Sequence, residues 1–257
     1  MTGFDCNCFV GNWPFHKVRR NTIEAIRELH EKNGIGGACV SSLEAIFYND
    51  PWEADEALHE QLKGLDNYHH IITVNPMLPG CLDSIRRAVK LWGIRGVRIF
   101  PGFHGYELRD PKMVEFSDLL RELDLTLFLT LRMEDERNTY LFHPKPVGIN
   151  DIMDYFYLNK GMKVIICGGW NGDMMYLNSR LDPDSDIYWE CSAMRGALYV
   201  VDDLYRANLT DRLLYGSMAP IFVLKSTRLL VETADIPDDI KEQILSCTAI
   251  KEKGWLA

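Results

Sequence analysis

The sequence predicts a (β/α)8 barrel, and three observations point to it. Eight short apolar segments alternate with helix-like segments along the whole chain. Most of the apolar segments are hydrophobic on successive residues, which is typical of parallel strands covered on both faces. No stretch rich in Gly, Pro or Ser divides the 257 residues. The pattern therefore favours one α/β domain over residues 1–257, built as a TIM barrel.

The eight expected strands are short, apolar and bounded by turn residues. They cover residues 3–9, 36–42, 70–76, 96–101, 125–131, 162–167, 186–191 and 212–217. A doubly wound open sheet is the alternative architecture, but no glycine-rich phosphate motif follows the first segment. The closed barrel is therefore the better prediction.

The helices are predicted from amphipathic spacing and from capping residues. At the start of the first one Asn21 can cap, and Gly34 can end it. Between them Ile23, Ile26 and Leu29 fall on one stripe. Further helices are expected over residues 52–64, 81–91, 111–123, 149–159, 174–181, 197–207 and 220–234.

Composition and charge exclude several classes of protein. With 47% hydrophobic and 25% charged residues the chain is globular in composition. A net charge of -9 and one short basic cluster at residues 17–20 argue against a nucleic-acid partner. No apolar run suits a membrane span, and seven scattered cysteines suggest reduced thiols. We expect a soluble cytoplasmic protein with a small-molecule partner; a homo-oligomer stays open.

In such barrels the reacting groups lie at the carboxyl ends of the strands. Side chains alternate along a strand, so Asp5, Asn7 and Phe9 are expected to face the barrel axis. Cys6 and Cys8 are then expected to face the helices. We interpret these two cysteines as small buried residues, because zinc-binding pairs are usually spaced Cys-x₂₋₄-Cys.

Two arginines near strand ends are candidate anion-binding residues. Guanidinium groups of Arg98 and Arg132 directed into one mouth would hold a carboxylate or phosphate. Pairing with a protein carboxylate such as Glu190 is the alternative for each. Trp170 is a candidate wall residue, although packing within its loop is the simpler explanation. The predicted substrate-binding set is Asn7, Arg98, Arg132, Trp170 and Glu190.

Four residues are candidates for catalysis. Asp5 is the candidate base, and His16 or His104, in loops after the first and fourth strands, is the candidate proton donor. Cys167 ends the sixth strand and is a candidate nucleophile. Structural histidines and buried thiols are the alternative explanations. Four other histidines lie on helices or at strand starts, which is the wrong end of a barrel for chemistry: His30, His59, His69 and His70.

The stretch "DCNCFVG" at residues 5–11 resembles the start of the amidohydrolase superfamily, in the branch called amidohydrolase family 2. Members of that branch open with Asp-x-His-x-His and a Gly two residues later. The segments "VNPM", "GIRGVRIFPG", "KVIICGG", "RLLYGSMAP" and "EQILSCTAI" resemble the branch in the same order. The resemblance covers essentially the whole chain and implies a hydrolase built on a TIM barrel.

In the family, these strand ends carry metal-binding histidines and a proton-accepting Asp. In this chain the corresponding residues are Asn7, Phe9, Thr130, Cys167 or Gly168, and Met218. These side chains are poor ligands for a divalent metal. We therefore expect no metal at this inherited position and no cofactor, and we expect chelators to leave folding and activity unchanged.

Two functions from different classes remain. The first is a metal-independent hydrolase acting on a small anionic substrate, such as a carboxylate or lactone, at the mouth of the barrel. The second is a catalytically inactive barrel that serves as a ligand-binding or scaffold protein. An enzyme requires charged groups that converge in one pocket, whereas a scaffold allows a mouth filled by Phe9, Met218 and tryptophans.

Overall fold

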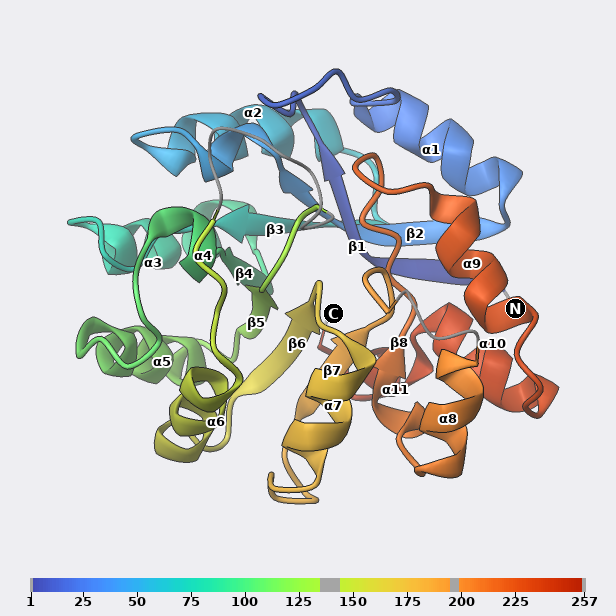
Figure 1. The fold of residues 1–257 in the computed structure, drawn as a ribbon. Coiled ribbons are helices and arrows are strands. Elements are labelled where there is room, and N and C mark those ends of the chain that lie inside the picture. The colour runs from blue at the N-terminus through green and yellow to red at the C-terminus, as the bar shows by residue number, and fades with distance from the viewer. Residues whose placement is uncertain (1, 135–143, 195–198, 256–257) are drawn as a thin grey trace.

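The computed structural model describes residues 2–134, 144–194 and 199–255. Eight parallel strands form one sheet in the order of the sequence, which confirms the (β/α)8 barrel. Figure 1 shows the strands at the centre and the helices around them. The strands are β1 Gly3–Val10, β2 Ile35–Ser42, β3 Tyr68–Thr73, β4 Gly96–Ile99, β5 Thr126–Thr130, β6 Lys163–Cys167, β7 Ile187–Glu190 and β8 Leu213–Leu214.

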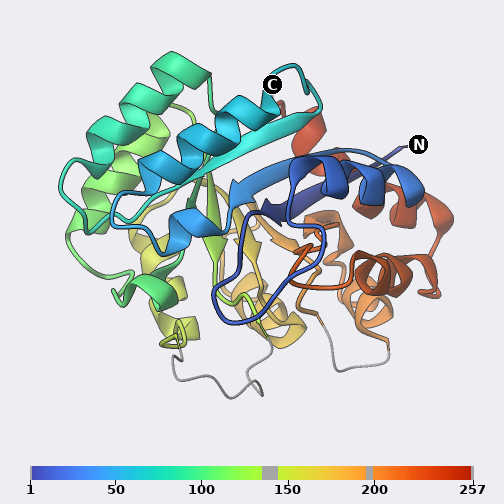
Figure 2. The ribbon, with the colours of Figure 1, turned by 90° about the horizontal axis from the view of Figure 1, so that it is seen from above.

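Helices follow the strands and cover the outside of the barrel, as the second view also shows (Figure 2). The first is capped by Thr22, whose side chain accepts a hydrogen bond from the amide of Ala25, and not by Asn21 as expected. The helices are α1 Ile23–Lys32, α2 Pro51–Leu62, α3 Cys81–Trp92, α4 Pro101–His104, α5 Lys112–Glu122, α6 Ile149–Leu158, α7 Asn171–Asn178, α8 Val200–Arg206, α9 Leu224–Glu232, α10 Asp238–Ser246 and α11 Thr248–Glu252.

The segment after β8 closes the barrel against β1. The amide of Cys6 donates to the carbonyl of Tyr215 at 3.0 Å, and the amide of Met218 donates to the carbonyl of Asn7 at 2.7 Å. The amide of Phe9 then donates to the carbonyl of Ala219 at 2.8 Å. These bonds hold residues 215–219 beside the first strand, although β8 itself is shorter than the expected strand at 212–217.

A bulge interrupts the regular alternation of β1. Asp5 is paired with Ala38 and Cys8 with Val40, so three steps along β1 match two steps along β2. An extra residue in one strand reverses the faces of the residues beyond it. As a result Asp5 and Cys8 approach His30 of α1, whereas Asn7 contacts groups inside the barrel. The expectation that Asp5 shares a face with Asn7 is wrong for this reason.

A separate apolar cluster, here called the mouth cluster, lies beyond the carboxyl ends of the strands. It is distinct from the core between the sheet and the helices. Aromatic rings pack within it, with Phe9 and Phe100 centred 6.5 Å apart. Its buried members are Phe9, Trp13, Val18, Leu43, Ile46, Phe100, Met133 and Met218.

Across residues 2–134, 144–194 and 199–255, no helix combines the length and the apolar composition that crossing a bilayer requires.

Candidate functional site

Arg98 of β4 is the central charged residue inside the barrel. Its side chain is fully buried, and its Nε donates to Oγ of Ser41 at 2.8 Å. Nη1 donates to Oδ1 of Asn7 at 2.8 Å and to Oγ1 of Thr130 at 3.0 Å. The guanidinium therefore bridges β1, β2 and β5 through neutral oxygen atoms.

The cation of Arg98 has no carboxylate at ion-pair distance among the residues that the structure describes. Its Nη2 is buried without a hydrogen-bond partner, and so is Nδ2 of the adjacent Asn7. A buried charge that is not neutralised costs free energy, as does each unpaired buried donor. Two unsatisfied donors next to a fixed positive charge are the chemistry that suits a carboxylate oxygen.

The residues that stand where the resembled family binds its metal do not suit a divalent ion. Asn7 and Thr130, which stand where the family has histidines, both accept hydrogen bonds from Nη1 of Arg98. The ring of Phe9 packs against the same guanidinium, and its centre lies 4.6 Å from Cζ of Arg98. Met218 is buried in the mouth cluster. A permanent cation bonded to these side chains would repel a metal ion placed among them.

Glu190 ends β7 and is fully buried. Its Oε1 accepts from the amide of Gly168 at 2.6 Å and from Oγ of Ser192 at 2.8 Å, and Oε2 accepts from the amide of Ser192 at 2.7 Å. Burial raises the pKa of Glu190, and these hydrogen bonds oppose the rise. A Cβ added to Gly216 would meet both Glu190 and Asn7, so the two side chains border one point of the barrel interior.

Cys167 lies inside the barrel at the end of β6. Burial raises the pKa of its thiol to about 12, so the group is neutral near pH 7. A cysteine nucleophile reacts as the thiolate. The structure therefore gives no support to Cys167 as a nucleophile.

The two candidate histidines lie in different surroundings. Nδ1 of His16 is 3.2 Å from Oε1 of Glu134, and its side chain is 42% exposed. His104 ends α4, and its Nε2 lies 2.9 Å from the carbonyl oxygen of Ile46. Burial lowers the pKa of His104. Neither histidine has a hydrogen bond to Arg98, so their proposed proton-transfer role stays a prediction.

Arg132 contacts the segment that follows β6. Its Nη1 donates to the carbonyl of Gly168 at 3.1 Å and lies 3.4 Å from Oδ2 of Asp173. The guanidinium stacks over the ring of Trp170 at 3.9 Å. Arg132 is thus engaged with a protein carboxylate and an aromatic ring, which is the alternative considered for it.

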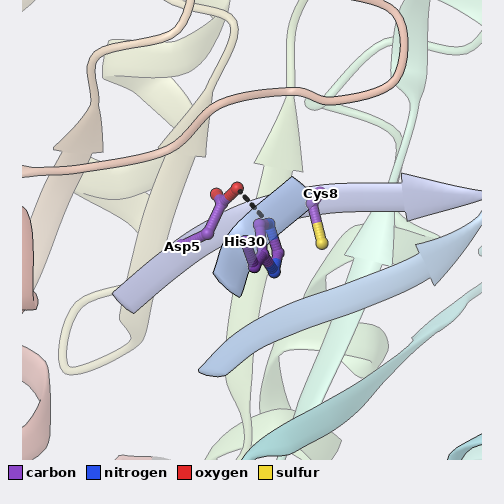
Figure 3. A group of neighbouring side chains, drawn as sticks. All are labelled: Asp5, Cys8 and His30. Atoms are coloured by element: carbon purple, nitrogen blue, oxygen red, sulfur yellow. Dashed lines mark hydrogen bonds and ion pairs between the residues drawn. The ribbon is translucent and has the colours of Figure 1, made fainter. Parts of the chain in front are cut away.

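Asp5 is directed toward α1 and away from the position expected of a base at the mouth. Its Oδ2 lies 3.2 Å from Nε2 of His30 (Figure 3). Oδ1 accepts from the amides of Ser217 at 2.9 Å and Asn7 at 3.0 Å, and Oγ of Ser217 donates to Oδ2. Nδ1 of His30 is 3.2 Å from the hydroxyl of Tyr68. This network fastens β1 to α1, β3 and the segment after β8.

His30 is the residue of this network that sequence reasoning set aside. It is on the buried stripe of α1, four residues after Ile26, and is fully buried. A histidine on an apolar helix stripe requires a polar partner inside the protein. The place of His30 on this apolar stripe was therefore the sequence signal for a buried polar partner.

All seven cysteines of the chain are free and buried. Burial raises the pKa of Cys8 and Cys39 well above the usual range of a thiol. The chain therefore carries reduced thiols in its interior and not a disulfide framework, as the sequence predicts.

Solved structures share this fold. An uncharacterized TIM-barrel protein from Bordetella bronchiseptica matches with a TM-score of 0.71 and 14% identity, covering 100% of this chain and 99% of that one. A probable 2-pyrone-4,6-dicarboxylic acid hydrolase from Acinetobacter baumannii with citric acid bound matches with a TM-score of 0.70 and 13% identity, covering 99% and 100%. A dihydroxybenzoic acid decarboxylase from a Polaromonas species with bound manganese and 2-nitroresorcinol matches with a TM-score of 0.68 and 14% identity, covering 97% and 96%.

The fold implied by the resemblance is confirmed. These hydrolase and decarboxylase structures and the present chain share one complete (β/α)8 barrel. No protein-family model and no curated protein sequence matches the chain. At 13–14% identity the comparisons establish architecture, and activity has to be argued from the site.

Proposed function

We propose that the protein is an amidohydrolase-like enzyme that binds a small carboxylate substrate at Arg98, inside the carboxyl end of the barrel. The observation that carries the proposal is the buried guanidinium with neutral partners only and a free Nη2 beside Nδ2 of Asn7. A substrate carboxylate would supply the missing negative charge and accept from both donors.

The chemistry of the neighbouring proteins supports this class of substrate. Their names describe a dicarboxylic acid hydrolase and a dihydroxybenzoic acid decarboxylase, both of which act on carboxylates. In the present chain, Arg98 would orient the carboxylate and compensate its charge. Glu190, whose raised pKa favours the protonated form, is the nearby group suited to proton transfer. We propose that this chemistry is independent of a metal at the inherited position.

The proposal is tested by titrating the purified chain with citrate, 2,6-dihydroxybenzoate and 2-pyrone-4,6-dicarboxylate in a calorimeter. We expect at least one to bind, and Arg98→Met to weaken its binding tenfold or more. Arg212→Met is the matched control, because Arg212 bonds to backbone carbonyls beside the start of β7. Equal affinities of wild type and Arg98→Met would contradict the proposal.

The mouth cluster favours a second function, a ligand-binding or scaffold protein without catalysis. Phe9, Trp13 and Met218 are buried over the strand ends where a substrate would enter. Turnover distinguishes the two functions, and it is measured by following product formation from each carboxylate that binds. Binding that is lost in Arg98→Met, together with no product from wild type, would favour the binding protein over the enzyme.

A further inference from the structure

A second group of reactive side chains lies on the side of β1 that faces α1, apart from Arg98. It comprises Asp5 and Cys8 of β1 and His30 of α1, all fully buried. One oxygen, one sulfur and one ring nitrogen of these residues lie within 4.8 Å of one another. Figure 3 shows the three side chains gathered between the strand and the helix.

We propose that Asp5, Cys8 and His30 bind a structural Zn²⁺ ion. Tetrahedral zinc bonds of about 2.0–2.3 Å place ligand atoms roughly 3–4 Å apart. Oδ2 of Asp5 and Nε2 of His30 already stand at 3.2 Å, and the sulfur of Cys8 lies within 4.8 Å of one carboxylate oxygen of Asp5 and one ring nitrogen of His30. A small adjustment of the Cys8 side chain completes three zinc ligands.

Charge balance supports a metal at this buried position. One carboxylate and one thiolate together neutralise a divalent cation, so the loaded site carries no net charge into the protein interior. The donor set also selects the ion. Thiolate and imidazole ligands suit zinc, whereas magnesium and calcium prefer all-oxygen sites.

Residues around a metal site usually hydrogen-bond to the metal ligands and fix their orientation, and neighbouring groups do this here. Oδ1 of Asp5 accepts from the amides of Asn7 and Ser217, so the ion would bind at Oδ2, in place of the present contact between Oδ2 and Nε2 of His30. Nδ1 of His30 lies 3.2 Å from the hydroxyl of Tyr68, which can accept its proton while Nε2 binds the metal. Oγ of Ser217 donates to Oδ2 and so holds this oxygen in place. Binding releases the proton of the Cys8 thiol.

This inference does not rest on the proposed function, because Arg98 is not one of the proposed zinc ligands. It also leaves untouched the prediction that the inherited metal position is empty of metal. It replaces two other expectations from the sequence, namely that Cys8 is only a small buried residue and that chelators leave folding unchanged.

The first test is metal content. The full chain, produced without a histidine tag in zinc-supplemented medium and passed through chelator-free gel filtration, is analysed by plasma mass spectrometry. We expect one zinc per chain, lost in Cys8→Ser and in His30→Gln. Cys39→Ser is the matched control, since Cys39 is an equally buried thiol on the neighbouring strand outside the cluster. A folded chain without zinc, or zinc retained by Cys8→Ser, would overturn the proposal.

The second test uses the wild-type chain alone, in case the variants fold poorly. Zinc is exchanged for Co²⁺, and the absorption spectrum is recorded. Coordination by Cys8 predicts a thiolate-to-cobalt charge-transfer band together with the intense visible bands of a tetrahedral site. Cobalt that binds without the charge-transfer band would show that Cys8 is not a ligand, and the proposal would be wrong.

Discussion

Nη1 of Arg98 lies 2.8 Å from Oδ1 of Asn7, so a fixed cation contacts the residue that stands where the resembled family has a metal-binding histidine. The same nitrogen reaches Thr130, at a second such position. One guanidinium thus links these two positions, and the neutral oxygen atoms of both side chains accept hydrogen bonds from it.

Replacing Arg98 by Lys separates the effect of charge from the effect of geometry. Lysine keeps the positive charge but lacks the planar fork that reaches Ser41, Asn7 and Thr130 together. We expect Arg98→Lys to bind the carboxylate roughly tenfold more weakly than wild type, a loss of about 1.4 kcal/mol. The calorimetric titration described above measures it. Affinity unchanged in the Lys variant would show that charge alone is recognised.

Gly216 is required where the barrel closes. A Cβ there would lie 2.5 Å from Oε2 of Glu190 and 2.9 Å from Cβ of Asn7. We expect Gly216→Ala to lower the free energy of unfolding in urea by about 1–3 kcal/mol. The control is Gly172→Ala in α7, where an added Cβ meets nothing within 4 Å and should stabilise by about 0.5–1 kcal/mol. Equal stabilities of the two variants would contradict this packing.

Ser217 links Asp5 to the segment that closes the barrel. Its hydroxyl donates to the buried carboxylate and accepts from the amide of Ala219 at 2.9 Å. Removing a hydrogen bond to a buried charge costs about 1.5–3 kcal/mol, which is the loss expected in Ser217→Ala. Ser226→Ala, at an exposed serine, should change stability by less than about 0.5 kcal/mol. Chemical denaturation of both variants provides the comparison.

The stability of the fold should fall as the pH decreases through the usual histidine range. Burial lowers the pKa of His104 below its ordinary 6.5, so the unfolded chain takes up a proton there that the folded chain does not. The pKa values of His59 and His69 are lowered in the same direction by burial. Thermal unfolding midpoints should therefore be lower at about pH 5.5 than at about pH 7.5.

The contribution of His104 is isolated by His104→Gln, which keeps a donor for the carbonyl of Ile46 and does not titrate. The drop in midpoint between the two pH values should be smaller in this variant than in wild type. An identical drop would assign the pH dependence to other histidines.

The barrel and the buried arginine follow from local patterns in the sequence. Apolar runs on successive residues identify strands covered on both faces, and the position of Arg98 within such a run placed it at a strand end. Its contact with Asn7 was not predicted, because β4 and β1 are not adjacent in the sheet and the two side chains meet only across the barrel interior. These predictions depend on periodicity, which the chain displays directly.

The direction of Asp5 could not be predicted, because a bulge is a property of the pairing between two strands and leaves no periodic mark in one of them. The partnership of Asp5 with His30 depends on that bulge. The scaffold alternative did anticipate a mouth filled by Phe9, Met218 and tryptophans, but not that Leu43 and Phe100 join them, since these residues come from separate loops or strand ends. Tertiary closure brings them together.

Because all seven thiols are buried, the rate at which a thiol reagent modifies them reports how often the surrounding structure opens. No cysteine is more than 8% exposed, so a thiol reagent reaches them only when the surrounding structure separates. Under conditions in which modification is faster than reclosing, the labelling rate equals the rate of unfolding. The order in which the seven sites acquire the label, read by peptide mass, would rank the strands of the barrel by how readily each one comes apart.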